Sequence, residues 1–272
     1  MTYSHILLER DGRLGRIVLN RPQILNGIDA TMLAQCRAAL AALQEDGGTD
    51  VVVLTGAGRA FCAGADLNFL EQALARSSGD ADRRYREMNE ILLEGHALIR
   101  ELRAFPGLVV SLVNGPVVGG GVGLALAADM VLAASSAYFS LPFVPKLGLV
   151  PDLGGIAFMQ NRIGVARAMG CALLGDRLDA ETAATWGLVW RCVPDGDLAA
   201  AGRALAGRLL ALPVSAVMEL KRLSAQALET PLDAYLDAER GAQSRLFTTP
   251  EATEGVMAFL AKRQPDFRAR LG

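Results

Sequence analysis

Two turns of small residues could stabilise a negative charge with their backbone amides. One runs from Phe61 to Asp66 and the other from Asn114 to Gly121, and each follows an apolar run typical of a buried strand. Small residues let a backbone approach a ligand closely. If a helix begins near each turn, its first amides lack partners within the helix, and the positive end of the helix dipole adds to them. Two such amides directed at one carbonyl oxygen would form an oxyanion hole.

The glycines of these turns also have a purely structural interpretation, in which they let helices pack closely on a sheet. Either turn alone leaves both interpretations open. Two phosphate-binding motifs are excluded. After Gly119 and Gly121, the third glycine of a dinucleotide fingerprint would fall at Leu124, and the chain has no Gly-Lys-Ser/Thr phosphate loop.

Asp152 is a carboxylate that the sequence places directly before the Leu153-Gly154-Gly155 segment. Apolar neighbours such as Phe143 and Leu153 would raise its pKa toward neutrality, which suits general acid/base work. The alternative is a helix cap, because an aspartate before Gly154 and Gly155 could accept amide hydrogen bonds at the start of a helix.

The cysteines predict reduced thiols without a metal or a disulfide. They lie far apart, with no pair at metal-ligand spacing: Cys36, Cys62, Cys171 and Cys192. Cys62 lies in the first turn, but neither His5 nor His96 has a motif that links it to the thiol. A buried structural thiol is therefore favoured over a nucleophile.

The elements that must position these residues form an α/β pattern. Alternating apolar residues around Asp11-Gly12 predict a hairpin over residues 5–19, and Asp29 is placed to cap a helix that ends near Glu45. Short apolar runs and helical spacings predict further strands over 51–54, 108–113 and 130–133, and further helices over 121–127 and 166–174. Strands alternating with helices imply an α/β fold.

The last part of the chain has only helical patterns, broken near Pro213, Pro231 and Pro250. We therefore expect an α/β core over residues 1–196 and an all-helical, oligomerising module over residues 197–272. The polar stretch over residues 76–90 has the composition of a mobile loop that runs into a helix.

Charge and hydropathy exclude several classes of protein. A net charge of −2 and scattered basic residues argue against nucleic-acid binding. The first residues lack the pattern of a secretory signal, so we expect a cytoplasmic protein. Residues 104–128 carry no charge, but Pro106, Pro116 and the glycines that follow would break a membrane helix. We expect no membrane span.

Four motifs occur in the order LTGAGRAFCAGADL, NGPVVGGG, GLVPDLGG and AFLAKRQPDF. Together they resemble the enoyl-CoA hydratase/isomerase (crotonase) superfamily over nearly the whole chain. The resemblance implies a spiral of strand-strand-helix units and a homotrimer or a dimer of trimers. It also implies an acyl-CoA thioester as substrate, with no cofactor beyond the coenzyme A that the substrate carries.

The resemblance assigns roles by position. Ala65 and Gly120 would donate the oxyanion amides, and Gly119, Gly123 and Phe143 would line the substrate pocket. Residues near the adenine, the pantetheine and the phosphates would be Ala63, Asp66, Leu67 and a cation from among Arg21, Lys262 and Arg263, because Ile24 stands where many relatives have a phosphate-binding lysine.

Hydratases of this family carry two glutamates where this chain has Gly123 and Phe143. Their absence argues against simple hydration, and a glutamate introduced at Gly123 would restore it only if the pocket has room. Asp152 stands where some isomerases of the family carry a single catalytic acid, although Pro145-Lys146 occupy the place of one residue and predict a local shift. Long runs of sequence, such as AMGCALLGDRLDAETAATWGLVW, also resemble epoxyphenylacetyl-CoA isomerases of bacterial phenylacetate breakdown.

These features predict an isomerase that shifts a double bond, or opens or rearranges a ring epoxide, on an acyl-CoA, with Asp152 as the acid/base. Two alternatives stay open. One is a hydratase or an acyl-CoA hydrolase with unconventional water activation. The other is a catalytically silent acyl-CoA-binding protein.

Overall fold

The computed structural model describes residues 3–45 and 47–268. The chain forms two compact units, Met1–Ala206 and Gly207–Gly272. Each unit is described by itself. No single helix among the described residues is long and apolar enough to cross a membrane, although one bent pair, residues 195–210 with 214–226, meets the length and composition criteria.

A six-stranded sheet forms the centre of the first unit, with strand order β1-β2-β3-β4-β6-β9. Its strands are β1 (Ile6–Asp11), β2 (Leu14–Leu19), β3 (Val51–Gly56), β4 (Leu108–Val113), β6 (Met130–Ala134) and β9 (Arg191–Val193). Strands β1 and β2 form the predicted antiparallel hairpin, and every later pairing is parallel. Strands β3, β4 and β6 are short, mainly apolar runs because both of their faces are buried.

Three further strands form a second sheet, and in the sequence they alternate with the last strands of the first sheet. The second sheet contains β5 (Val117–Val118), β7 (Tyr138–Ser140) and β8 (Leu178–Asp179). Helix α4 (Gly120–Leu126) connects β5 to β6, and all seven of its residues are buried. The second glycine turn therefore passes from a strand into a helix in the centre of the core.

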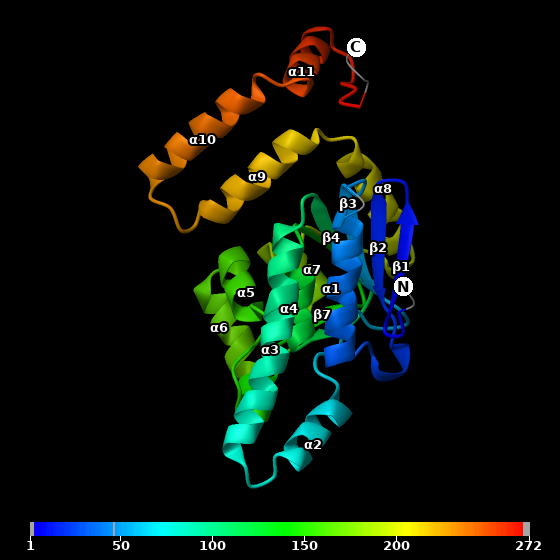
Figure 1. The fold of residues 1–272 in the computed structure, drawn as a ribbon, viewed down its shortest axis with the longest axis vertical. Coiled ribbons are helices and arrows are strands. Elements are labelled where there is room, and N and C mark those ends of the chain that lie inside the picture. The colour runs from blue at the N-terminus through cyan, green and yellow to red at the C-terminus, as the bar shows by residue number, and fades with distance from the viewer. Residues whose placement is uncertain (1–2, 46, 269–272) are drawn as a thin grey trace. The chain divides into compact units, whose positions relative to one another are not determined.

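Helices cover the large sheet, as Figure 1 shows for α1 and α3. The helices of this unit are α1 (Ala30–Glu45), α2 (Leu67–Arg76), α3 (Ala81–Ala104), α5 (Gly155–Ile163), α6 (Val165–Leu174) and α7 (Ala180–Trp186). Asp29 caps α1 as predicted, because its Oδ1 accepts the amide of Met32 at 2.8 Å. The charge-free stretch 104–128 forms β4, β5 and α4, as expected.

The second unit is helical, which confirms the expected tail. Helices α9 (Val214–Gln226), α10 (Leu232–Leu246) and α11 (Pro250–Leu260) each begin at or directly after the prolines that the sequence singled out. Helix α8 (Leu198–Leu210) spans the division between the units.

The division lies ten residues later than the expected boundary after residue 196. The reason is packing: a Cβ on Gly202 of α8 would lie 2.4 Å from a methyl group of Leu112 in β4, so the start of α8 contacts the sheet. The expected loop over residues 76–90 is also shorter than predicted. Only Ser77–Asp80 is non-helical, because Asp80 caps α3 through the amide of Arg83 at 2.8 Å.

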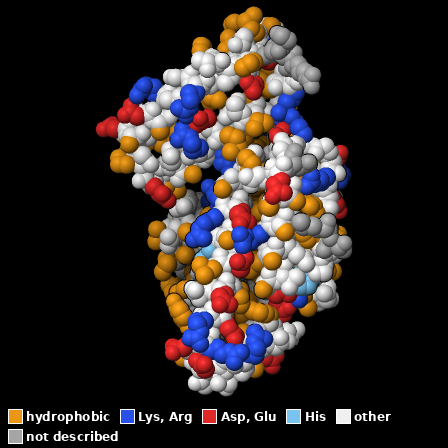
Figure 2. Space-filling model, in the orientation of Figure 1, with side chains coloured by type: hydrophobic (Ala, Val, Ile, Leu, Met, Phe, Trp, Pro, Cys, Tyr) orange, Lys and Arg blue, Asp and Glu red, His pale blue; other side chains and the backbone are white. Residues whose placement is uncertain are grey.

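Basic side chains gather at the connection between α2 and α3, as Figure 2 shows at the lower end of the view. Arg83 pairs with Glu87 at 2.8 Å, and Arg84 donates to the hydroxyl of buried Ser77 at 3.3 Å. These contacts hold a segment whose polar composition alone predicted a loop.

Candidate active site

The two glycine turns lie side by side. A parallel bridge joins Cys62 to Val117, and the amide of Val118 donates to the carbonyl of Cys62 at 2.9 Å. A Cβ on Gly64 would lie 2.9 Å from the carbonyl oxygen of Val118, and Gly64 has a φ of 90°. Gly119 has a φ of 57°, and its Cβ would lie 3.6 Å from the Cα of Gly64. Backbone contact and a positive φ both favour glycine at Gly64, whereas at Gly119 the positive φ alone favours it.

Ala65 presents a free backbone amide from the first turn. Ile28 pairs with the residues on either side of it: the amide of Ile28 donates to the carbonyl of Gly64 at 2.7 Å, and the amide of Asp66 donates to the carbonyl of Ile28 at 2.9 Å. In an extended segment, successive amides point to opposite sides, so the Ala65 N–H points away from Ile28. Within the described part of the chain, this N–H donates no hydrogen bond.

Gly120 presents the second amide. It is the first residue of α4, so its N–H has no partner within the helix. It also donates no hydrogen bond to any other group in residues 3–45 or 47–268. Because Gly64 and Gly119 are in contact, the two unpaired amides follow directly after neighbouring backbone segments. The oxyanion hole formed by these two amides stays a prediction.

Asp152 lies beside Gly120. Its Oδ1 is 3.0 Å from the position of a Cβ on Gly120. This oxygen is buried and has no hydrogen-bond partner in the described structure. Burial raises the pKa of the Asp152 carboxyl group to about 6.

The Asp152 side chain does not cap a helix. The residue before α5 is Gly154, which makes no side-chain cap, and it is the backbone carbonyl of Asp152 that accepts the Gly155 amide, at 2.9 Å. The geometry therefore argues against the helix-cap interpretation and leaves the carboxyl group available for proton transfer.

Gly123 does not open onto space, contrary to its assignment to the substrate pocket. A Cβ there would lie 2.3 Å from the carbonyl oxygen of Leu153 and 2.8 Å from its carbonyl carbon. Backbone atoms cannot rotate away as a side chain can. The room that a glutamate at this position would need is already filled by the Leu153 backbone, so the condition set for Gly123→Glu to restore hydration is not met in this structure.

Phe143 is buried, and its ring reaches the second turn, with Cζ 3.5 Å from the position of a Cβ on Gly119. It begins a π-helical turn over Phe143–Leu147. A π-turn accommodates one residue more than an α-helical turn. The local shift expected at Pro145-Lys146 relative to the family stays a prediction.

Arg21 is held in ion pairs. It donates to Asp66 Oδ2 at 2.8 Å and to the carbonyl oxygen of Gly27 at 2.7 Å, and it lies 3.0 Å from Asp29 Oδ2. Asp66 in turn caps α2 through the amide of Asn68 at 3.0 Å. Arg21 and Asp66 thus fix the segment next to Ala65, and this geometry favours a structural role over contact with coenzyme A.

The other residues expected near coenzyme A differ in their surroundings. Ala63 donates its amide to the carbonyl of Leu25 at 2.9 Å, and Leu67 is exposed at the start of α2. Arg263 makes a bidentate pair with Glu254, at 2.6 and 2.8 Å, which lowers the pKa of Glu254 to about 2. Lys262 lies beside it in the second unit, in the left-handed region at φ 52°.

Cys62 is buried, and burial raises the pKa of its thiol to about 12. A thiol of that pKa is not a nucleophile at neutral pH, which agrees with the structural interpretation. Its backbone matters more, because a Cβ on Gly121 would lie 2.5 Å from the Cys62 carbonyl oxygen.

Arg162 of α5 supports the far end of α4. Its guanidinium donates to the carbonyl oxygens of Leu126 at 2.7 Å, Ala128 at 3.0 Å and Leu188 at 3.2 Å. Burial lowers the pKa of Arg162 to about 10, which still leaves it charged at neutral pH. A cation at this position also stabilises the C-terminal end of the helix dipole.

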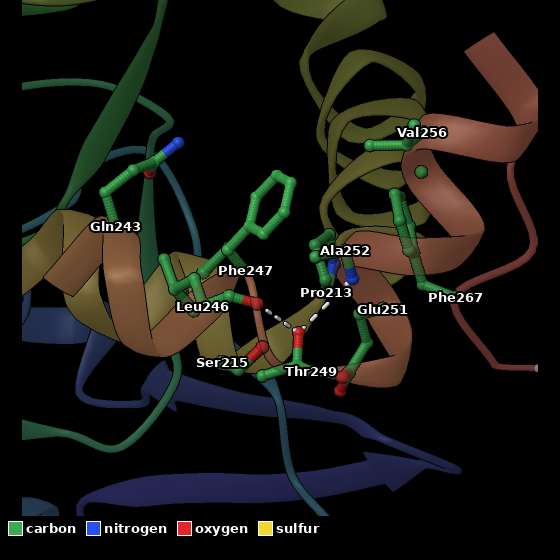
Figure 3. A pocket seen from close by; sticks show the side chains of 12 residues that line it. Pro213, Ser215, Gln243, Leu246, Phe247, Thr249, Glu251, Ala252, Val256 and Phe267 are labelled. Carbon is green, nitrogen blue, oxygen red and sulfur yellow. Dashed lines mark hydrogen bonds between the residues drawn. The ribbon is translucent and has the colours of Figure 1, made fainter. Parts of the chain in front are cut away.

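The second unit contains a cavity of about 310 Å³, shown in Figure 3, that holds none of the predicted site residues. Thr249 uses its hydroxyl within the unit, donating to the carbonyl of Leu246 at 2.7 Å and accepting the amide of Ala252 at 3.2 Å. The remaining wall is mainly apolar, with Phe247 and Phe267 on it. Ser215, Gln243 and Glu251 add polar side chains to this wall.

Comparison with known proteins gives a consistent result over the whole chain. A family model described as enoyl-CoA hydratase/isomerase matches residues 9–270. A Rhodobacter capsulatus protein named "Probable enoyl-CoA hydratase" is 38% identical over 271 residues, 99% of this chain and 100% of that protein. The 1,2-epoxyphenylacetyl-CoA isomerase of Escherichia coli is 39% identical over 254 residues, 93% of this chain and 94% of that protein.

A solved structure agrees with these relatives. The crystal structure of an enoyl-CoA hydratase from Polaromonas sp. JS666 has a TM-score of 0.88 at 31% identity, covering 96% of this chain and 98% of that chain. Hydratase names are more common than isomerase names among such relatives. The fold expected from the motifs is confirmed.

Proposed function

The chain belongs to the enoyl-CoA hydratase/isomerase family, and within that family we propose that it is an enoyl-CoA isomerase with Asp152 as its single acid/base. The observation that carries the proposal is Oδ1 of Asp152, which is buried, has no hydrogen-bond partner among the described residues and lies 3.0 Å from the position of a Cβ on Gly120. A carboxylate with a pKa of about 6 can both accept and return a proton near neutral pH.

The proposed reaction follows from the arrangement of donors and acid. The thioester carbonyl oxygen of the substrate accepts hydrogen bonds from the amides of Ala65 and Gly120. These donors stabilise the negative charge that develops on the oxygen when a carbon-bound proton leaves. Asp152 takes that proton from one carbon and returns it to a carbon two positions away. The double bond shifts by one position along the acyl chain. The cycle consumes no water and leaves Asp152 as it began.

Hydration is the alternative that the names of most relatives suggest. It requires activation of a water molecule and delivery of a proton, work that two carboxylates divide in hydratases of this family. Here Phe143 occupies one of the two positions, and the Leu153 backbone fills the space next to Gly123 at the other. Both observations favour the isomerase. A ring-epoxide acyl-CoA is a second candidate substrate, suggested by the similarity to the isomerase of Escherichia coli.

We also propose a homotrimer or a dimer of trimers. The helices of the second unit expose large apolar side chains that a soluble monomer rarely leaves in water, among them Leu220, Leu228, Phe247, Phe259 and Leu260. Leu205 within α8 is buried, whereas Leu212, just after that helix, is 38% exposed. Contact with the phosphates by Lys262 stays a prediction.

Product analysis tests the function. The purified protein is incubated with 2-enoyl-CoA, 3-enoyl-CoA and ring-epoxide acyl-CoA, and the products are identified by mass and by NMR. We expect double-bond migration or epoxide rearrangement without a change in mass. Asp152→Asn is expected to reduce turnover by roughly a hundredfold to ten-thousandfold, with affinity for acetoacetyl-CoA nearly unchanged.

Three results would contradict this proposal. A hydrated product formed by the wild type as the main reaction would assign it to the hydratases. Wild-type turnover by a folded Asp152→Asn variant would move the acid/base role to another group. Tight binding of every acyl-CoA without any product would favour a silent binding protein.

A further inference from the structure

We propose that Leu153 is a positioning residue that fixes the Asp152 carboxyl group at the site. The inference rests on the acid/base role proposed above for Asp152. Leu153 sits in a socket lined by three glycines of two helices, which are Gly95 of α3 and Gly120 and Gly123 of α4.

Each glycine of the socket accommodates a different part of Leu153. A Cβ on Gly95 would lie 2.5 Å from Cδ2 of Leu153, and one on Gly120 would lie 3.2 Å from its Cδ1. A Cβ on Gly123 would lie 2.3 Å from its carbonyl oxygen and 2.8 Å from its own Cβ. Helices α3 and α4 therefore both contact the Leu153 side chain, and α4 also contacts the Leu153 backbone.

The backbone of Leu153 shows that this fit is imposed. Leu153 has a φ of 48°, in the left-handed region that a leucine rarely adopts. Such a conformation persists only where the surrounding packing over-determines it. The buried side chain in the glycine socket provides that packing.

The consequence reaches Asp152 through one peptide bond. The buried Oδ1 of Asp152 has no hydrogen-bond partner among the described residues. The backbone that carries Asp152 therefore sets where Oδ1 lies beside Gly120, and Leu153 is the adjacent anchored residue. The position of the Asp152 carboxyl group therefore depends on glycine at 123, because a side chain at 123 would displace the Leu153 backbone and move Asp152 with it.

Two variants test the positioning role of Leu153, and a third variant serves as a matched control. Gly123→Ala pushes against the Leu153 backbone, whereas Leu153→Gly keeps the left-handed conformation accessible and removes the anchor from the socket. Gly170→Ala is the control, because Gly170 also lies within a helix, α6, and a Cβ there would meet nothing within 4 Å. Each protein is compared with wild type for melting temperature, acetoacetyl-CoA affinity, kcat, and kcat/KM against pH.

We expect both test variants to lose about a hundredfold in kcat, the order of loss for a displacement of about 1 Å, with affinity nearly retained. The acidic limb of kcat/KM is expected to move to lower pH, because water would reach the displaced Asp152 carboxyl group. Gly170→Ala should match wild type in kcat and in the pH of the acidic limb. If Gly123→Ala fails to fold, Leu153→Gly decides.

Wild-type kcat in a folded Gly123→Ala or Leu153→Gly variant would overturn the inference. A fall in kcat with an unmoved acidic limb would assign Leu153 to packing alone and would overturn it too. The Asp152→Asn variant separates this failure from failure of the proposed function. If Asp152→Asn is inactive while Leu153→Gly is fully active, the acid/base role of Asp152 is retained and the positioning role of Leu153 is rejected.

Discussion

Asp152→Asn should stabilise the folded protein at pH 8 while it removes turnover. Burial raises the carboxyl pKa from its ordinary value of 3.8 to about 6. The folded state therefore binds the proton more tightly than the unfolded state, and ionisation favours unfolding. This destabilisation is absent below pH 3.8, grows as the pH rises toward about 6, and stays constant above that. At about 1.4 kcal/mol for each pH unit, it reaches about 3 kcal/mol.

Urea unfolding of wild type and Asp152→Asn at pH 5 and at pH 8, at one protein concentration, measures this effect. The free energy of unfolding of the variant minus that of wild type should be more positive at pH 8 than at pH 5. The unpaired Asn amide lowers the difference equally at both pH values, so the change with pH is the decisive quantity. A variant that is less stable by the same amount at both pH values, as loss of a helix cap would cause, would refute the reasoning.

Four further predictions follow from the described contacts. The kcat/KM of the isomerase reaction should fall as the pH drops below about 6, because Asp152 must be ionised to accept a proton, and a limb lying below pH 4.5 would contradict its raised pKa. Gly123→Glu should lower the melting temperature and yield no hydrated product by mass, since the Leu153 carbonyl oxygen occupies the space. Arg21→Gln should destabilise by roughly 3–5 kcal/mol, the usual cost of breaking a buried ion pair, whereas Arg240→Gln, which breaks an exposed pair with Asp237, should leave urea unfolding nearly unchanged. Analytical ultracentrifugation at micromolar concentration should show a trimer or hexamer, and a monomer would contradict it.

Local chemistry made much of the fold predictable from the sequence. The Asp11-Gly12 turn predicted the first hairpin, and buried apolar runs predicted β3, β4 and β6. The cap by Asp29 and the breaks at the prolines of the tail depend only on neighbouring residues, so they too could be predicted. The two glycine turns were identifiable because contact between backbones requires glycine.

Long-range contacts explain what the sequence alone did not reveal. Nothing local shows that Leu153 adopts a left-handed conformation or that Gly95, 58 positions earlier, makes room for it. Arg21 was expected near phosphates, but its partner Asp66 lies 45 residues away. The boundary after residue 196 failed to anticipate that α8 packs on β4, because helical spacing does not say which surface a helix covers.

The support that Arg162 gives to α4 has a mechanical consequence. Helix α4 carries the Gly120 amide at its start, and α5, which begins three residues after Asp152, holds the end of α4 through the guanidinium of Arg162. The proposed hydrogen-bond donor and the proposed acid are therefore held by two helices that the Arg162 contacts join. We expect a movement of this pair of helices to carry both groups in the same direction, so that the separation between them varies less than the position of either group.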